Sequence, residues 1–130
     1  MPDRKAPSWL TEWEYAHRGL HGPGLPENSL SAFSAAIARG MGIECDVQRA
    51  RDGQAMVFHD FELERLTAET GPVGERSAEE LARIELSGSH DRIPTLRRML
   101  DEVAGRVPIL FEIKSRRGSF ARTGALCQAV

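Results

Sequence analysis

The chain has 130 residues, enough for one small domain, and its composition is that of an ordinary soluble globular protein. Its formal net charge of −2 excludes a general attraction to nucleic acid or to an acidic membrane surface. The sequence predicts no membrane span, because it contains no run of about 18 apolar residues. It also predicts no secretory signal, because no apolar stretch follows its first basic residues.

The first residues predict a lead-in followed by a strand. Residues 1–12 hold the apolar side chains of Trp9 and Leu10, and residues 13–17 are typical of a short strand. Residues 17–28 are dense in glycine and proline, which favours a loop.

A helix and a second strand are predicted next. Apolar side chains recur at helical spacing up to about Arg39, and Gly40 supplies the stop. Asn28 or Ser29 can cap the first turn of this helix. Residues 43–48 then contain enough apolar and β-branched side chains to form a strand.

Turn and capping signals divide the middle of the chain. Residues 51–54 read Arg-Asp-Gly-Gln, which is typical of a tight turn, and residues 55–59 are a further predicted strand. Residues 62–76 are polar and contain glycine and proline, so we expect mostly loop. Residues 77–80 read Ser-Ala-Glu-Glu, a capping box that precedes a short helix.

The last third of the chain predicts a helix, a strand and another helix. Thr95 can cap a helix that ends near Gly105. Residues 109–114 are the next predicted strand, and residues 118–130 favour the start of a further helix.

This alternation of strands and helices predicts an α/β fold with a parallel sheet. The polar side chains gather at the carboxyl ends of the predicted strands, which is the active-site mouth of a TIM-type (β/α) barrel. A closed barrel needs eight strands and about 250 residues. We therefore expect residues 1–130 to supply the first half of such a barrel, with about three to four of its strands.

Acidic side chains lie inside two of the apolar strands. Successive side chains on a strand point to opposite faces, so Glu44 and Asp46 share one face, and Glu112 and Lys114 share one face of another strand. Such groups are costly to bury unless they pair, bind a metal or take part in chemistry. Three carboxylates without a cysteine suit Mg²⁺ or Ca²⁺. A structural ion-pair network with Lys114 and Arg18 is the alternative.

Two histidines end predicted strands near these acids. His17 and His59 could divide general acid and base duties at near-neutral pH. His21 and His90 lie in predicted loops, where we expect structural or merely exposed side chains. Cys45 lies between the two acids of its strand, so it should face the opposite way, as a buried free thiol. That thiol suits a reducing cytosol and predicts a cytoplasmic protein.

Two cations complete the set of side chains that could do chemistry. The guanidinium of Arg18 can hold two phosphate oxygens, and Lys114 is a point charge beside Glu112. Together with the acids and the histidines, they indicate phosphoryl-ester chemistry. Glu27 and Asn28 lie in the first loop and could either orient ligands or cap the helix.

A series of motifs occurs in order between about residues 14 and 115. They are His17-Arg18-Gly19, Pro26-Glu27-Asn28-Ser29, Glu44-x-Asp46-Val47, Asp52-Gly53, His59-Asp60-x-x-Leu63-x-Arg65-x-Thr67, Gly71, Pro94-Thr95-Leu96 and Glu112-Ile113-Lys114. Their order and spacing resemble the glycerophosphodiester phosphodiesterases. The Pro-Glu-Asn and Glu-Ile-Lys runs favour this family over the similar sphingomyelinase D and phosphatidylinositol phospholipase C enzymes.

The resemblance implies a TIM-type barrel and metal-dependent hydrolysis of a small glycerophosphodiester to glycerol 3-phosphate and an alcohol. It assigns roles to matching residues as follows: metal ligands Glu44, Asp46 and Glu112; acid and base His17 and His59; phosphate-binding residues Arg18 and Lys114. The family's later strands are missing, so the chain is a fragment, a truncated product, or half of a barrel that two copies close by self-association. An inactive half barrel that is a remnant or a phosphate- or partner-binding module is the alternative function.

Overall fold

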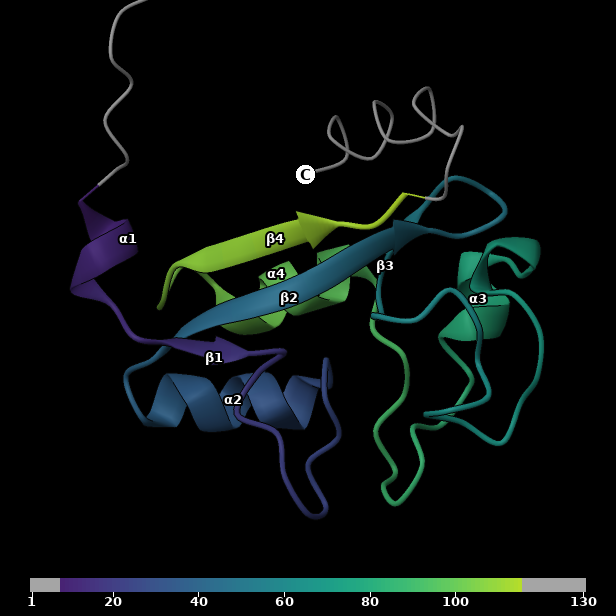
Figure 1. Cartoon of the computed structure of the whole chain (residues 1–130), viewed down its shortest axis with the longest axis horizontal. Coiled ribbons are helices and arrows are strands. Elements are labelled where there is room, and N and C mark those ends of the chain that lie inside the picture. The colour runs from purple at the N-terminus through teal and green to yellow at the C-terminus, as the bar shows by residue number, and fades with distance from the viewer. Residues whose placement is uncertain (1–7, 116–130) are drawn as a thin grey trace, which may run out of the picture.

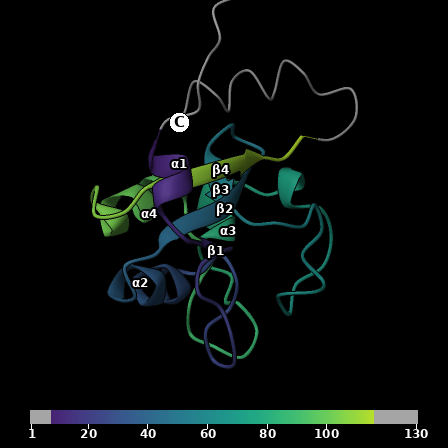
Figure 2. The same ribbon diagram turned by 60° about the vertical axis from the view of Figure 1, so that its left-hand side comes forward.

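The computed structural model describes residues 8–115, so the helix predicted over residues 118–130 lies outside the described part. Strands β1 (Tyr15–His17), β2 (Gly42–Arg49) and β4 (Ile109–Ile113) form a parallel sheet with β2 in the middle. Helices α2 (Leu30–Ala38) and α4 (Leu96–Val103) lie together on one side of these strands (Figures 1 and 2). This is the predicted β/α arrangement, and its strands keep the order in which they occur along the chain.

Strand β3 (Ala55–Val57) corrects one part of the prediction, because it pairs with β2 antiparallel rather than parallel. A parallel return requires a crossover of a dozen or more residues, whereas residues 50–54 only form a tight turn. Gly53, with φ of +89°, provides the left-handed backbone of that turn. The β2–β3 pair is therefore a hairpin, and β3 runs beside β2 in the opposite direction.

The helix boundaries follow the capping residues. Helix α1 (Trp9–Glu12) replaces part of the expected lead-in, and the first strand begins at Tyr15 rather than at residue 13. Helix α2 (Leu30–Ala38) is capped by Ser29, whose hydroxyl accepts a hydrogen bond from the Ala32 amide. Of the two capping residues considered, Ser29 therefore caps the helix and Asn28 does not.

The remaining helices confirm their sequence signals. The predicted loop over residues 62–76 contains only the short 3₁₀ helix η1 (Val73–Glu75). The capping box at Ser77 starts α3 (Ala78–Leu81). Thr95 caps α4 (Leu96–Val103), which ends in a left-handed residue just before Gly105.

The main core lies between the sheet and helices α2 and α4. Its buried side chains come mainly from β2 and these two helices: Phe33, Ala36, Ile43, Cys45, Val47, Leu96, Met99 and Val103. The Cys45 thiol donates to the Met99 sulfur at 3.7 Å, and burial raises the pKa of this thiol. The prediction of a buried free thiol facing the helices is thus confirmed. No helix within residues 8–115 is long and apolar enough to cross a membrane.

A glycine sets how closely the first loop approaches α2. Gly19 has φ of +79°, and a Cβ added there would lie 2.9 Å from the Ala32 Cβ and 3.0 Å from its carbonyl carbon. We therefore expect Gly19→Ala to lower the free energy of unfolding by about 2–4 kcal/mol, from overpacking together with left-handed strain.

Gly24 offers a matched control for this substitution. Its φ is +75°, but an added Cβ would meet nothing within 4 Å, so Gly24→Ala should cost only about 1 kcal/mol. Urea unfolding of both variants measures the difference. Equal losses would mean that the close approach of Gly19 to α2 does not matter for stability.

Candidate active site

Three carboxylates meet at the mouth of the parallel strands. Glu44 and Asp46 point to the same face of β2, and the β2–β4 register places Glu112 opposite Asp46. One ligand oxygen from each residue lies within 4.8 Å of those of the other two. Asp46 is fully buried, Glu44 is mostly buried and Glu112 is exposed. The sequence prediction that these three acids come together is confirmed.

The donor set fits a hard divalent cation. Glu44 Oε1 and Asp46 Oδ1 are buried, and neither accepts a hydrogen bond from the described residues. Burial and the neighbouring Asp46 charge raise the pKa of Glu44, and these two effects outweigh the opposing contributions of His17 and of the Arg18 backbone. Buried, unsatisfied carboxylate oxygens that converge on one point are the kind of ligands that Mg²⁺ and Ca²⁺ take.

Lys114 and Arg18 provide part of the alternative ion-pair network. Lys114 Nζ donates to Glu112 Oε1 at 3.2 Å and lies 3.9 Å from Asp46 Oδ1. This ammonium holds the pKa of Glu112 below its usual range. Arg18 Nε lies 3.5 Å from Asp46 Oδ2. The cations therefore pair with Asp46 and Glu112, whereas Glu44 lies beside the imidazole of His17, at 3.9 Å from Nε2.

The first loop positions Asp46. Arg18 and Asn28 both adopt left-handed backbone conformations, and the Asn28 amide donates to the Arg18 carbonyl at 2.8 Å. The Asn28 side chain then donates to Asp46 Oδ2 at 3.0 Å, and Glu27 accepts from Arg18 Nη1 at 3.0 Å. Glu27 and Asn28 thus contact the site residues Arg18 and Asp46, and neither of them caps α2.

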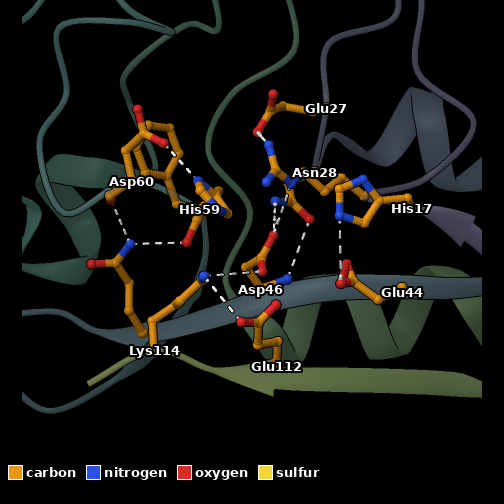
Figure 3. A network of polar contacts seen from close by, with 12 residues as sticks. His17, Glu27, Asn28, Glu44, Asp46, His59, Asp60, Glu112 and Lys114 are labelled. Carbon is orange, nitrogen blue, oxygen red and sulfur yellow. Dashed lines mark hydrogen bonds and ion pairs between the residues drawn. The ribbon is translucent and has the colours of Figure 1, made fainter. Parts of the chain in front are cut away.

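The two predicted histidines lie on opposite sides of the acids (Figure 3). His17 ends β1, is largely exposed, and its Nε2 lies 3.9 Å from Glu44 Oε2. His59 follows β3, and its Nδ1 lies 2.7 Å from Asp60 Oδ1. His21 and His90 are exposed, as expected.

The antiparallel hairpin explains how His59 reaches this place. The Phe58 amide donates to the carbonyl of Asp46, so β3 returns to the level of the acids on β2. Gln48 donates from its side chain to the carbonyls of Phe58 and Asp60 at 2.8 and 2.7 Å. His59 therefore comes to the site from a fold-back of β2 and not from a parallel barrel strand of its own.

Arg65 is a site residue to which the sequence assigned no role. It donates from Nε and Nη2 to Asp60, and from Nη1 and Nη2 to Glu27, at 2.8 to 3.0 Å. Hydrogen bonds from Arg65 and His59 lower the pKa of Asp60 to about 2. Burial opposes ionisation of Glu27, but Arg65 and Arg18 outweigh it and lower the pKa of that carboxyl. The motif that contains Arg65 was visible, but a lone arginine in a loop has no periodicity that predicts its partners.

The depressed pKa of Asp60 predicts a pH-dependent contribution to stability. The ionised carboxylate stabilises the fold above its unfolded pKa of about 4, and this contribution is lost as the pH falls through about 2. Asp60→Asn should therefore lower the free energy of unfolding on the order of 1–2 kcal/mol at pH 7. The difference in free energy of unfolding between Asp60→Asn and the parent should shrink between pH 4 and pH 2, as measured by urea unfolding. The exposed Asp101→Asn is the control, and a gap independent of pH would contradict the expectation.

Comparisons with known proteins place this site in a family. The parallel strands and the acids at their carboxyl ends define part of a TIM-type barrel with its active-site mouth. The family model described as "Glycerophosphoryl diester phosphodiesterase family" matches residues 17–129, so the chain belongs to that family. A glycerophosphodiester phosphodiesterase of Bacillus altitudinis is 36% identical over 117 residues, which is 85% of this chain and 47% of the relative.

Solved structures agree with this assignment. A glycerophosphodiester phosphodiesterase from Agrobacterium tumefaciens is 31% identical with a TM-score of 0.72, over 79% of this chain and 47% of that one. A phosphodiesterase from Oleispira antarctica, solved in complex with the product sn-glycerol-3-phosphate, is 26% identical with a TM-score of 0.81. That match covers 92% of this chain and 53% of the other. The chain therefore spans about half the length of these relatives.

Proposed function

We propose that this chain carries the catalytic residues of a phosphodiesterase that hydrolyses glycerophosphodiesters to glycerol 3-phosphate and an alcohol. The observation that carries the proposal is the pair of buried, unsatisfied oxygens of Glu44 and Asp46, which lie beside Glu112 between two histidines. Family membership supports the reaction class, and the product bound to the Oleispira antarctica enzyme supports the glycerol 3-phosphate half of the substrate.

Glu44, Asp46 and Glu112 are the residues that would hold Mg²⁺ or Ca²⁺. When bound there, such a cation supplies Lewis-acid stabilisation of negative charge on the phosphoryl oxygens. Both cations accept carboxylate oxygens, so the donor set alone does not select between them.

The other side chains bind the phosphate and move protons. Arg18 and Lys114 lie around Asp46 and would attract the anionic phosphodiester to the mouth of the strands. His17 and His59 flank that position, so one can take a proton from the attacking water while the other gives a proton to the leaving alkoxide, and the products are glycerol 3-phosphate and the alcohol. Neither histidine is assigned to acid or base by its position alone.

An inactive half barrel is the second candidate function. The observation that favours it is the unpaired outer edge of β4 within the described residues. Within residues 8–115, β4 pairs along one edge only, with β2. In this alternative the chain keeps Arg18 and Lys114 for phosphate or partner binding, or self-associates without turnover. Cytoplasmic location and closure of the barrel by a second copy stay predictions.

Release of glycerol 3-phosphate from glycerophosphocholine tests the proposal. The purified chain is assayed with Mg²⁺, with Ca²⁺ and then with EDTA, and its mass in solution is determined by light scattering. EDTA-sensitive release supports the phosphodiesterase and tells whether one copy suffices. A folded chain that releases nothing but binds glycerol 3-phosphate, even with His17→Ala and His59→Ala combined, would favour the binding module instead.

A further inference from the structure

Arg65 joins two loops that are far apart in sequence. Its guanidinium donates to Asp60, beside His59, and to Glu27, in the loop between β1 and α2. Each carboxylate receives two of its hydrogen bonds, at 2.8 to 3.0 Å. This fork is specific to arginine, because a lysine ammonium cannot present fixed parallel donors to two carboxylates at once.

Asp60 in turn fixes the state of the His59 ring. Hydrogen bonds from Arg65 and His59 keep Asp60 ionised over the whole neutral range, so its carboxylate can only accept. The 2.7 Å contact with His59 Nδ1 therefore requires a proton on Nδ1. In the neutral imidazole, Nε2 is then the nitrogen with a free lone pair, and it is the atom available for proton transfer.

Glu27 makes this arrangement more than a surface ion pair. Its carboxylate is only 9% exposed, and it accepts from Arg18 as well as from Arg65. Glu27 thus connects Arg18 on the first loop, through Arg65 and Asp60, with His59 after β3. Two site elements that no strand pairing connects directly are held together through it.

We propose that Arg65 is a positioning residue, which holds Asp60 so that His59 keeps its proton on Nδ1 and offers Nε2 to the reaction. The proposal rests on the proposed function for its role in turnover. Arg65 is half-exposed and acts through Asp60. Arg18 keeps its own hydrogen bond to Glu27 when Arg65 is replaced, so the effect should fall mainly on the rate of the chemical step and much less on substrate or metal binding.

The test uses Arg65→Lys, which keeps the positive charge and removes the fork. With ¹⁵N-labelled protein, the histidine ring nitrogens report the tautomer directly, and His59→Asn identifies the resonances of His59. We expect Nδ1–H in the parent chain and a clear shift toward Nε2–H in Arg65→Lys. In the phosphodiesterase assay, kcat should fall about ten- to hundred-fold while KM and Mg²⁺ affinity change less than about twofold.

Asp60→Asn is the second variant, because an amide at this position can donate to Nδ1 and so stabilise the opposite tautomer. The matched control is Arg76→Lys, which replaces another arginine paired with a glutamate, Glu69, on the 62–76 segment. That control should leave both the His59 tautomer and kcat at parent values.

The outcomes separate this proposal from the proposed function. A parent chain with Nε2–H at His59 would overturn the positioning role, and so would an unchanged Nδ1–H tautomer in folded Arg65→Lys and Asp60→Asn. Since the ring resonances need no turnover, a chain that hydrolyses nothing can still confirm the tautomer. An active parent with an unaffected Arg65→Lys variant leaves the phosphodiesterase standing and removes Arg65 from it.

Discussion

Glu44→Gln should abolish the binding of Mg²⁺ and Ca²⁺ to this chain while leaving its fold intact. The side chains have the same shape, but glutamine offers a neutral amide in place of the ionised carboxylate that a hard cation requires. Glu44 Oε1 accepts no hydrogen bond within the described residues, so the substitution breaks no existing pair through that atom. We expect the metal affinity to fall at least about 100-fold.

The free energy of unfolding of Glu44→Gln should stay the same or rise, although its metal affinity falls. Burial and Asp46 raise the pKa of Glu44 in the folded chain, so the ionised carboxylate opposes folding. Its penalty is absent below the unfolded pKa and fully present once the pH has risen through the folded pKa. In EDTA at pH 7, Glu44→Gln should therefore unfold with an equal or higher free energy than the parent.

Isothermal titration with each cation and urea unfolding in EDTA measure the two effects. The control is Glu79→Gln, an exposed glutamate paired with Arg83 in α3, which should change neither metal affinity nor turnover. If Glu44→Gln instead lowers the free energy of unfolding and leaves the metal affinity unchanged, Glu44 belongs to a structural pair and is not a metal ligand.

The sequence predicts this acidic site well because the information is local. Alternation along β2 places Glu44 and Asp46 on one face whatever the rest of the fold does. Glu112 joins them only through strand pairing, but a parallel sheet aligns carboxyl ends, so a β/α pattern was enough to bring it near. Cys45 follows from the same alternation in the opposite sense, with its thiol against Met99.

The features that the sequence missed or left open depend on turn length and on distant partners. Strand β3 departs from the parallel sheet that the β/α pattern predicts, because a five-residue connection cannot make a parallel crossover. Asn28 and Ser29 are both good capping residues, and only the contact of Asn28 with Asp46 distinguishes them. Arg65 pairs with Glu27, which lies 38 positions earlier in the sequence, and no local pattern encodes such a pair.

His17→Ala and His59→Ala should each lower kcat by about 10²- to 10⁴-fold, the usual size of a general acid or base contribution. Their environments predict different side effects. His17 is 65% exposed and 3.9 Å from Glu44, so its removal should hardly change stability. His59→Ala loses the hydrogen bond to Asp60 and should cost about 1 kcal/mol. Steady-state kinetics and urea unfolding of both variants measure these effects.

A substrate with a better leaving group can identify which histidine is the general acid. In a glycerophosphodiester with an activated aryl leaving group, the aryl oxide departs without being protonated. The variant that lacks the general acid should therefore recover most of its rate with that substrate. The variant that lacks the base should not recover, because the attacking water still needs a proton acceptor. Combining the two substitutions should cost little more than the worse single change, since both act in one turnover.

His21→Ala and His90→Ala are the controls, because both side chains are exposed in loops. Neither should change kcat with either substrate. If the activated substrate rescues neither active-site variant, or rescues both equally, the two histidines do not divide the proton transfers. His59, held through Nδ1 by Asp60, would then serve to orient charge at the mouth of the strands, and the proton path would run through another group at the site.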